Sequence, residues 1–493
     1  MEKRRIINYR PIVFCFLAMA FGIATILLSD FNRLYVSLLF CLTIITLIIF
    51  TFKIKRFGKY IIVPIFLLFG IVAGTFYGEL NVDGRVHYDK ASIKGRVCEI
   101  RSYGAVIEDV EAAGSKLKGK AILFNSKKFE IGDLVYAYDD ISTYTIDTDD
   151  GFVISLIDDN ILHYSESDSF GKIGETKLKI NEKIKLKTKE IFDKYLKSDS
   201  ADIAYGMLFG DTSLMDFDLK GELSKTGLNH IFAVSGLHIG FLAGMIIWIN
   251  KKLKIKRWFN VFATTLVLVC YNMLCGYSPS MIRATVMMLI LLAGRELGYK
   301  NDGLSRLCFA GLIIIIFNPI SLFTVSFQMS FAAVFGILAF SPYFIKKLNR
   351  IPKWSAELAG LSLGVNIAIF PILCYYFNSF AILFLPVNML IMPLMPIIYA
   401  CLIMLTVLNL IFPYVAFVLP LDYLFAPIKL VTLAVGQLSF SVIEIAFGKL
   451  SLYTYLTCEA VISPYLLIKK SVKAKIIVIL ILLYTAFTVL SII

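Results

Sequence analysis

The stretch NHIFAVSGLHIG, residues 229–240, stands where a polar segment gives way to a long apolar run. It contains His230 and His238, two of the four histidines of the chain, together with Ser235. The apolar run continues to about residue 250, which is long enough for a helix to cross a bilayer. Ionisable side chains in such a helix are costly and usually face the helix bundle or a wet cavity. The stretch therefore predicts a membrane helix with a polar end.

Apolar runs of similar length recur along the chain, and hydrophobic residues make up 58% of its 493 residues. This composition is typical of a protein that crosses a membrane several times. Further apolar segments between residues 281 and 446 are shorter or interrupted by proline. The predicted spans are residues 11–28, 34–52, 61–78, 230–250, 258–275, 325–344, 356–377, 450–468 and 475–493.

The net charge of +13 is unevenly distributed. Acidic residues outnumber basic ones between residues 79 and 200, so the excess of Lys and Arg lies elsewhere. Short loops that carry basic clusters usually stay in the cytoplasm. We therefore expect a multi-pass protein of the cytoplasmic membrane, with a cytoplasmic N-terminus and with residues 79–205 outside the cytoplasm. The basic loops are residues 3–5, 53–59, 251–257, 346–353 and 469–475.

The segment between the third and fourth predicted spans changes character. Residues 91–165 consist of short alternating runs separated by Gly, Asp and Asn, which predicts a small β domain. Residues 176–197 combine apolar positions with many lysines. This pattern indicates an amphipathic helix on a membrane surface, against the membrane domain or against its own domain. The expected domains are three transmembrane helices at 1–78, an extracytoplasmic β domain at 79–170, an amphipathic linker helix at 171–205 and a membrane domain at 206–493.

Glycine and proline give two further signals. Prolines repeatedly interrupt the apolar sequence between residues 318 and 427. Broken helices at membrane depth are tolerated where they face protein or a watery cavity, so this pattern favours a transporter or channel over an anchor. Two stripes of glycine at a spacing of four residues predict close contacts between helix backbones. The stripes are Gly70, Gly74 and Gly78, and Gly236, Gly240 and Gly244.

The histidines and Ser235 also raise the question of catalysis. The sequence VSGLH around Ser235 does not match the GxSxG pattern of a serine hydrolase, and no histidine belongs to an HxH or HExxH pattern. The stretch GSKLKGKA, residues 114–121, has alanine where a P-loop needs Ser or Thr. We therefore expect no enzymatic activity, no metal and no cofactor. His230 and His238 either line a path for a polar substrate or make structural hydrogen bonds.

From residue 205 onward the chain carries an ordered set of motifs. They are YGMLFGDTSLMD (205–216), GLNHIFAVSGLHIG (227–240), CGYSPSMIRATVMM (275–288), NPISLFTVSFQMSFAAVFGIL (318–338) and FPILCYYFNSFAILFLPVNMLIMPL (370–394). With these motifs the chain resembles the ComEC-type DNA-internalisation (competence) family of membrane proteins. The resemblance covers residues from about 200 to 470, and the leading spans with the β domain resemble that family's N-terminal region.

The resemblance implies a polytopic α-helical membrane protein with a small extracytoplasmic β domain of OB-like fold. It implies a membrane channel that takes up single-stranded DNA during natural transformation. The implied partners are single-stranded DNA, membrane lipid, an external DNA receptor and a cytoplasmic helicase-like motor. Many family members continue into a metallo-β-lactamase-like domain that this chain lacks, so we expect a separate nuclease. The alternatives are a transporter of another polyanionic or lipid-linked substrate and, less favoured, an intramembrane hydrolase.

Arg283 is the sharpest candidate for the DNA path. It follows a Ser-Pro helix start in an otherwise apolar helix, where the helix dipole does not favour a cation. Its anionic neighbour is therefore a DNA phosphate, a lipid headgroup or a carboxylate of the chain. Asp211 either pairs with a cation or orients a histidine, and Gln328 either lines the path or bonds neighbouring helices. The predicted path residues are His230, Ser235, His238, Arg283, Asp211 and Gln328.

The β domain supplies a second set of candidates for contact with external DNA. Single-stranded nucleic acid is usually held by a basic groove with aromatic platforms. Acidic residues outnumber basic ones between residues 79 and 170, so any DNA-binding face must be local. The alternative is that these are solvated charges on an ordinary barrel. The candidates are Lys94, Arg96, Arg101, Lys118, Lys120, Lys127 and Lys128.

Overall fold

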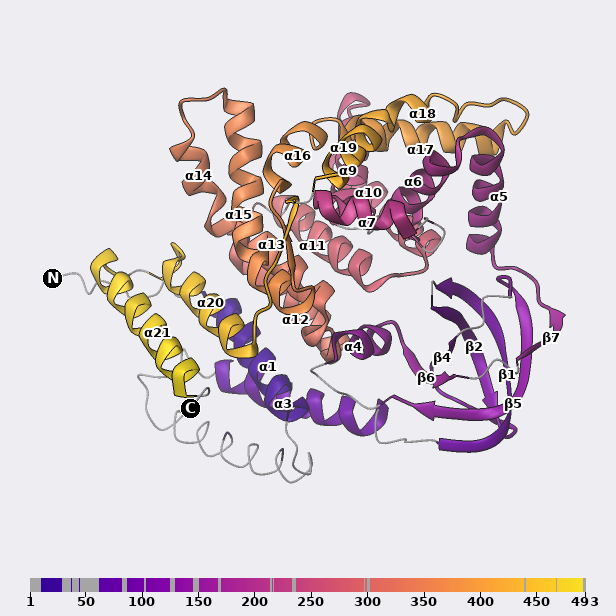
Figure 1. The fold of residues 1–493 in the computed structure, drawn as a ribbon, viewed down its shortest axis with the longest axis horizontal. Helices are drawn as coiled ribbons and strands as arrows, with labels where there is room; N and C mark the ends of the chain where they lie inside the picture. Colours follow the sequence, from indigo (N-terminus) through magenta and orange to yellow (C-terminus); the bar gives the residue numbers. More distant parts are fainter. Residues whose placement is uncertain are drawn as a thin grey trace.

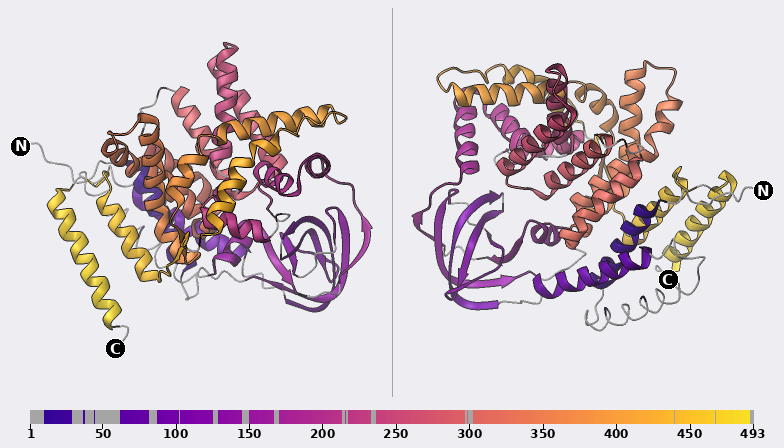
Figure 2. Two further views of the ribbon diagram at one scale, coloured as in Figure 1. Left: turned by 45° about the horizontal axis from the view of Figure 1, so that its top comes forward. Right: turned by 180° about the vertical axis from the view of Figure 1, so that it is seen from behind.

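The structure is a computed structural model, in which N-terminal helices precede a strand barrel and a large helical body follows it. The barrel lies at one end of the molecule and the C-terminal helices lie at the other (Figures 1 and 2). The residues that the structure describes are 10–28, 37, 44, 62–81, 87–101, 103–124, 129–144, 150–166, 170–212, 215, 217–232, 236–296, 298, 302–438, 440–466 and 468–490.

Five strands close into a barrel, and two short strands extend it. Strand β1 pairs with β2 and also with β5, while β4 and β6 complete the ring between them. Only the β4–β6 pair within this ring is parallel. Alternate apolar side chains fill the interior, as expected where one face of each strand is buried. The strands are β1 (His87–Arg101), β2 (Gly104–Ala112), β3 (Ser115–Lys116), β4 (Lys120–Phe124), β5 (Asp133–Thr143), β6 (Ile161–Ser165) and β7 (Gly171–Glu175).

The predicted boundaries of the β domain need two corrections. Helix α3 (Ile62–Asn81) continues beyond residue 78, and β7 lies beyond residue 170 but pairs with β5. The sequence of β7 contains two glycines and is largely exposed, so it has no alternating apolar pattern. Residues 171–205 are not one helix either, because α5 (Ile180–Tyr195) ends where Leu196 becomes extended and α6 (Ser198–Phe209) begins afterwards.

Helix α5 packs against the helical body. Its residues Ile191 and Phe192 are buried in the same apolar cluster as residues of α6 and of α9 (Gly236–Lys252). Of the three positions that the amphipathic pattern left open, the structure shows the one against the helical domain.

Several predicted spans coincide with described helices. By length and composition, two described helices can cross a bilayer: Trp258–Cys275 within α10, and α15. The bent pairs α13–α14 and α16–α17 meet the same criterion when each pair counts as one span, with bends of 42° and 52°. The helices are α10 (Arg257–Cys275), α13 (Val325–Ala339), α14 (Ser341–Lys347), α15 (Lys353–Tyr376), α16 (Phe384–Ile391) and α17 (Met395–Ile411).

The run from 230 to 250 is not described as a single helix. The structure gives a short helix α8 (Asn229–Phe232) and a separate α9, and residues 233–235 lie outside the described part. The predicted span 34–52 also lies outside it, except for Ser37 and Ile44. The span predicted at 450–468 is shorter, because α20 (Lys449–Ile462) ends just before Pro464.

The remaining helices complete the body around the core. They are α1 (Pro11–Leu27), α4 (Gly151–Asp158), α7 (Phe217–Thr226), α11 (Pro279–Glu296), α12 (Gly303–Phe317), a 3₁₀ helix (Pro319–Phe323), α18 (Leu421–Leu424), α19 (Ala426–Gly436) and α21 (Lys470–Leu490). A two-stranded sheet joins β8 (Ser379–Ala381) and β9 (Val442–Glu444). Helix α4 leaves the barrel and buries Ile154 and Ile157 in a cluster with α1 and α12. The barrel is therefore anchored to the body through α4 as well as through α5.

The two glycine stripes have different surroundings. A Cβ at Gly70 would collide with the carbonyl oxygen of Met19, and one at Gly74 would lie 3.4 Å from the Cα of Ile23. Gly78 is buried on the same helix. These glycines lie where α3 meets α1.

The expected packing role is wrong for Gly240 and Gly244. A Cβ at either position meets no described atom within 4 Å, and both residues line a pocket. A Cβ at Gly236 would lie 3.9 Å from the Cβ of Ala284 in α11. The spacing of small residues identified a bare helix face in α9, but most of that face borders open space.

Candidate functional site

A cavity of about 1040 Å³ lies between the barrel and the helical body. Its wall combines the barrel, the start of α5, the end of α6, the junction of α10 with α11, and the end of α12 with the 3₁₀ helix. Helices α4 and α5 both contribute lining residues. Figure 1 shows both helices between the strands of the barrel and the helical body. We refer to this space as the large cavity.

Three of the sequence motifs meet at the large cavity. The first motif contributes Gly210, Asp211 and Thr212; CGYSPSMIRATVMM contributes Gly276, Tyr277, Ser278, Pro279 and Arg283; the NPISLF stretch contributes Asn318 and Ser321. Gly210 ends α6 in a left-handed conformation with φ of 74°, and Gly276 ends α10 similarly with φ of 84°. Each glycine thus turns the chain at the cavity wall, since only glycine adopts this conformation without strain.

Arg283 is the most deeply buried charged residue of this site, with 1% of its surface exposed. Its Nη2 donates a hydrogen bond to Oγ of Ser326, and its Nη1 lies 3.8 Å from Oδ2 of Asp158. Of the three neighbours left open by the sequence, the structure places a carboxylate beside it. That carboxylate comes from α4, at the base of the barrel.

Asp158 is itself held firmly in place. Its Oδ1 accepts hydrogen bonds from Nδ2 of Asn318 at 2.7 Å and from Oγ of Ser321 at 2.6 Å. Burial raises the pKa of Asp158 above its usual value, although Ser321 and Arg283 act in the opposite direction. Asp158 was not among the predicted site residues, and its only signal in the sequence is an Asp-Asp pair directly after the apolar run FVISLI.

The large cavity contains charges of both signs. Its basic lining residues are Arg101, Lys120, Lys179, Lys185, Lys220 and Arg283, and its acidic lining residues are Glu99, Glu108, Asp158, Asp159, Glu182 and Asp211. Arg101 is fully engaged, because its Nε lies 2.7 Å from Glu99 and its Nη2 lies 2.8 Å from Asp159. The cavity is therefore a mixed polar space and not a uniformly basic groove.

The predicted external contacts on the barrel are only partly exposed. Arg96 is 8% exposed, and its guanidinium pairs with Glu182 of α5 and with Glu108 at 2.6 Å. The prediction that Arg96 contacts external DNA is therefore wrong, because α5 covers its side chain. Lys94 and Lys118 are exposed, whereas Lys120 is half-buried at the cavity. Lys127 and Lys128 lie outside the described residues.

The predicted path residues separate into different environments. His230 has an exposed side chain, and its Nδ1 lies 3.0 Å from the carbonyl oxygen of Gly227. Gln328 turns back onto its own segment, where Nε2 donates to the carbonyl oxygen of Phe323 at 3.3 Å. Ser235 lies outside the described residues. Of the six predicted path residues, the structure brings Arg283 and Asp211 to the same cavity.

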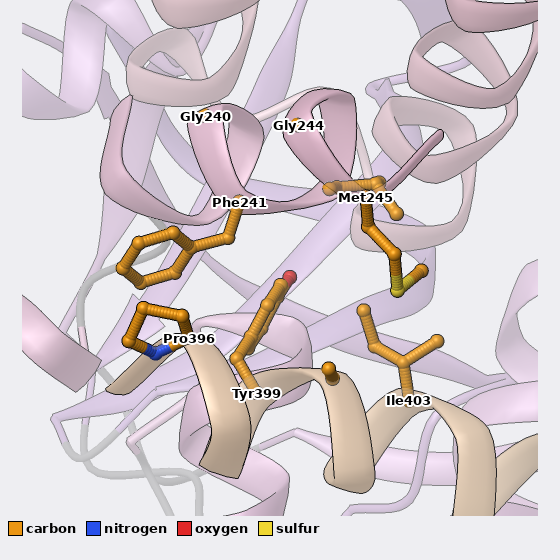
Figure 3. A pocket seen from close by; sticks show the side chains of 9 residues that line it. Gly240, Phe241, Gly244, Met245, Pro396, Tyr399 and Ile403 are labelled. Carbon is orange, nitrogen blue, oxygen red and sulfur yellow. The ribbon is translucent and has the colours of Figure 1, made fainter. Parts of the chain in front are cut away.

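His238 lies at a second, smaller pocket region. It is 1% exposed, and its ring packs edge-on against the ring of Tyr399, with centroids 4.9 Å apart. Tyr399 projects from α17 toward α9 and lines a pocket of about 260 Å³ together with Gly240, Gly244 and Met245 (Figure 3). We refer to this space as the small pocket.

A hydrogen-bonded pair of tyrosines links the linings of the two spaces. The hydroxyl of Tyr399 donates to that of Tyr271 at 2.8 Å, and the Tyr271 hydroxyl donates to the carbonyl oxygen of Leu208 at 2.6 Å. Cys275, which lines the large cavity, reaches the same carbonyl through its Sγ at 3.7 Å. This tyrosine pair was not predicted, because each tyrosine is an isolated aromatic residue in an apolar run.

The described residues contain no group of three or more His, Cys, Asp and Glu side chains that is arranged to hold a metal ion. Among solved structures, none matches the chain.

Comparison with known proteins identifies relatives of part of the chain. The chain is 32% identical to ComE operon protein 3 of Bacillus subtilis over 40% of its own length and 25% of that protein. It is 23% identical to the uncharacterized protein YcaI of Escherichia coli over 39% of its length and 27% of that protein. An uncharacterized protein of Aquifex aeolicus is 30% identical over 32% of this chain and 36% of that protein. The aligned part is thus about a quarter to a third of each relative.

The family model described as "Competence protein" matches residues 207–471. This match covers more than half of the chain. It includes the motifs at residues 275–288 and 318–338, which contribute to the wall of the large cavity. The chain therefore belongs to the competence protein family.

Proposed function

We propose that this protein is a multi-pass channel of the cytoplasmic membrane that takes up single-stranded DNA during transformation. The observation that carries the proposal is the meeting of three family motifs at one polar cavity between the barrel and the helices. Residues distant in sequence converge there although the rest of the helical body is mainly apolar. Such convergence is typical of a ligand site.

The barrel suits a protein that handles nucleic acid. Its closed ring of five strands has the strand number of an OB-fold, a barrel that often binds oligonucleotides. We propose that this OB-like barrel lies outside the cytoplasm and presents DNA to the large cavity. Lys120 and Lys179 line the cavity, one from the barrel and one at the start of α5, and they would contact phosphates.

The proposed path crosses the tyrosine pair. It leads from the large cavity past Tyr271 and Tyr399 into the small pocket between α9 and α17. Aromatic rings suit such a path because every base can stack on them without regard to sequence. The bent pair α16–α17 provides interrupted helices next to it, and these are tolerated at membrane depth where they border a cavity.

The proposed partners follow from the family and not from any contact in the structure. They are an external DNA receptor, a cytoplasmic helicase-like motor that provides energy, and a separate nuclease that removes the other strand. Membrane lipid would surround the apolar helices.

The test is uptake of labelled DNA into a nuclease-protected compartment of the competent host. We expect uptake to be lost when the chain is deleted and restored by the intact chain. Reversal of charge at Lys120 and Lys179 together should reduce uptake at least tenfold, because both line the large cavity. Lys90→Glu is the matched control, since Lys90 is exposed on strand β1 and does not line the cavity.

Undiminished uptake in the deletion strain would refute the channel. The search would then turn to another polyanionic or lipid-linked substrate. Normal uptake by the doubly reversed variant would leave the family role intact but would exclude the large cavity as the route.

A further inference from the structure

We propose that Arg283 is the residue of the large cavity that holds a phosphodiester group, and that Asp158 keeps this hold weak enough for release. The identity of the ligand rests on the proposed function. The inference adds a specific phosphate site and an opposing role for a residue of the barrel.

Arg283 has donors that the protein does not use. Its Nε and Nη1 have no hydrogen-bond partner among the described residues, although the residue is almost completely buried. Buried N–H groups without a partner are costly, most of all on a charged group. A guanidinium matches the oxygens of a phosphate in charge and in geometry. An anion that enters the large cavity lies beside Arg283, and a small movement of the lining would give it access to Nε and Nη1, which are covered in this structure.

The neighbouring carboxylate balances the charge without filling these donors. Oδ2 of Asp158 lies 3.8 Å from Nη1 of Arg283, which is within ion-pair range but too long for a hydrogen bond. Asn318 and Ser321 fix the other carboxylate oxygen, so Asp158 stays in place. An arriving phosphate therefore meets an unfilled guanidinium beside a fixed negative charge.

The second arginine on the described cavity wall differs in this respect. Arg101 bonds to Glu99, to Asp159 and to the hydroxyl of Tyr103, so its donors are occupied. Arg283 is thus the arginine of this wall that has donors to offer. A conducting path needs sites that bind weakly enough to release the substrate, and the carboxylate beside Arg283 serves that need.

The test is binding by the purified full-length chain in lipid nanodiscs, with two probes. One probe is a fluorescent single-stranded oligonucleotide, and the other is inorganic polyphosphate, which has no bases. We expect Asp158→Asn to bind both probes about tenfold more tightly, because it removes a negative charge near the phosphate. Arg283→Gln should bind both about tenfold more weakly, with a smaller dependence on salt.

The opposite signs distinguish a binding site from a structural ion pair, whose loss would weaken binding in both variants. Asp302→Asn is the matched control, because it breaks another ion pair, with Arg10 at 2.7 Å, that does not line the cavity. If Arg283→Gln fails to fold, Arg283→Lys keeps the charge and loses the guanidinium, so it should show a partial loss.

Weaker or unchanged binding by Asp158→Asn would overturn the proposed attenuation, and unchanged binding by both Arg283 variants would overturn the phosphate site. Failure of the intact chain to bind either probe would also overturn the site. If polyphosphate responds as expected while the oligonucleotide does not bind, the phosphate site stands and the proposed DNA function falls.

Discussion

His163 in the barrel has both ring nitrogens engaged. Its Nε2 faces the carbonyl oxygen of Lys118 at 3.0 Å and must therefore donate, so Nδ1 of the neutral ring accepts from the Thr143 hydroxyl at 2.9 Å. A second proton on the ring would remove that acceptor. Burial also lowers the pKa of His163 below its usual value of 6.5.

The resulting pH dependence has a definite sign. A lowered pKa in the folded state means that the unfolded chain binds the proton more readily, so the stability from His163 is present above pH 6.5. It is lost as the pH falls through the lowered pKa. We expect barrel amides to exchange hydrogen faster at pH 5.5 than at pH 7.5, after correction for intrinsic rates. His163→Gln should reduce this difference, and an equal difference in that variant would exclude His163 as the cause.

The individual residues of the site were only partly predictable. Arg283 stood out because a cation in an apolar helix needs an anionic partner. Its partner Asp158 did not, because only the folded chain brings α4 of the barrel domain against α11. Gln328 bonds to its own segment, an outcome that the polar pattern of the helix cannot distinguish from lining a path.

At the scale of elements, the contact between α1 and α3 depends on glycine. Gly70 has no room for a Cβ, since the obstructing atom is a backbone carbonyl of Met19 that cannot rotate away. We expect Gly70→Ala to lower stability by about 1–3 kcal/mol through overpacking. Thermal unfolding of the purified protein in detergent measures this loss.

Gly244→Ala provides the control for the same substitution in α9. A Cβ at Gly244 meets no described atom within 4 Å, so the change should be tolerated. Similar destabilisation by the two variants would mean that loss of glycine itself, and not the α1–α3 contact, is responsible.

The contact between the barrel and α5 depends on Arg96 and Glu182. Burial raises the pKa of Glu182, but hydrogen bonds from Arg96 and from the backbone of Lys179 outweigh it and lower the pKa overall. Glu182→Ala leaves Arg96 buried with fewer partners, which costs about 3–5 kcal/mol. Faster hydrogen exchange at the start of α5 is the expected signature. Lys116→Ala is the control, because its pair with Asp109 is exposed and its loss should leave α5 unchanged.

Elements whose apolar residues recur with one clear period, or form a long run, could be predicted from the sequence. The boundaries and contacts between elements could not. The runs at 258–275 and 356–377 correspond to α10 and α15 because length and composition alone make an apolar helix there. Strand β7 was not predicted, because its sequence has no alternating apolar pattern and its pairing with β5 stabilises it.

At the scale of the whole molecule, the proposed path meets one hydrogen-bonded barrier, the pair of Tyr271 and Tyr399. Cys275 lines the large cavity and Tyr399 lines the small pocket. Tyr271 bonds to Tyr399 and shares the carbonyl oxygen of Leu208 with Cys275. If this barrier closes a path at rest, removal of one ring should open it more effectively than removal of one hydroxyl. The ring fills space, whereas the hydroxyl contributes only a hydrogen bond of about 1 kcal/mol.

Ion leakage from proteoliposomes tests this barrier without any DNA. We expect Tyr399→Ala to increase the leak of a small cation at least tenfold and Tyr399→Phe to increase it only slightly. Tyr414→Ala is the matched control, since Tyr414 is 96% exposed and lines neither space. The Tyr399→Ala variant must first melt at the same temperature as the intact chain. If its liposomes then leak no more cation than those with the intact chain, the path does not pass between Tyr271 and Tyr399. The large cavity would then lead into the membrane elsewhere, and the proposed phosphate site at Arg283 would remain open to its own test.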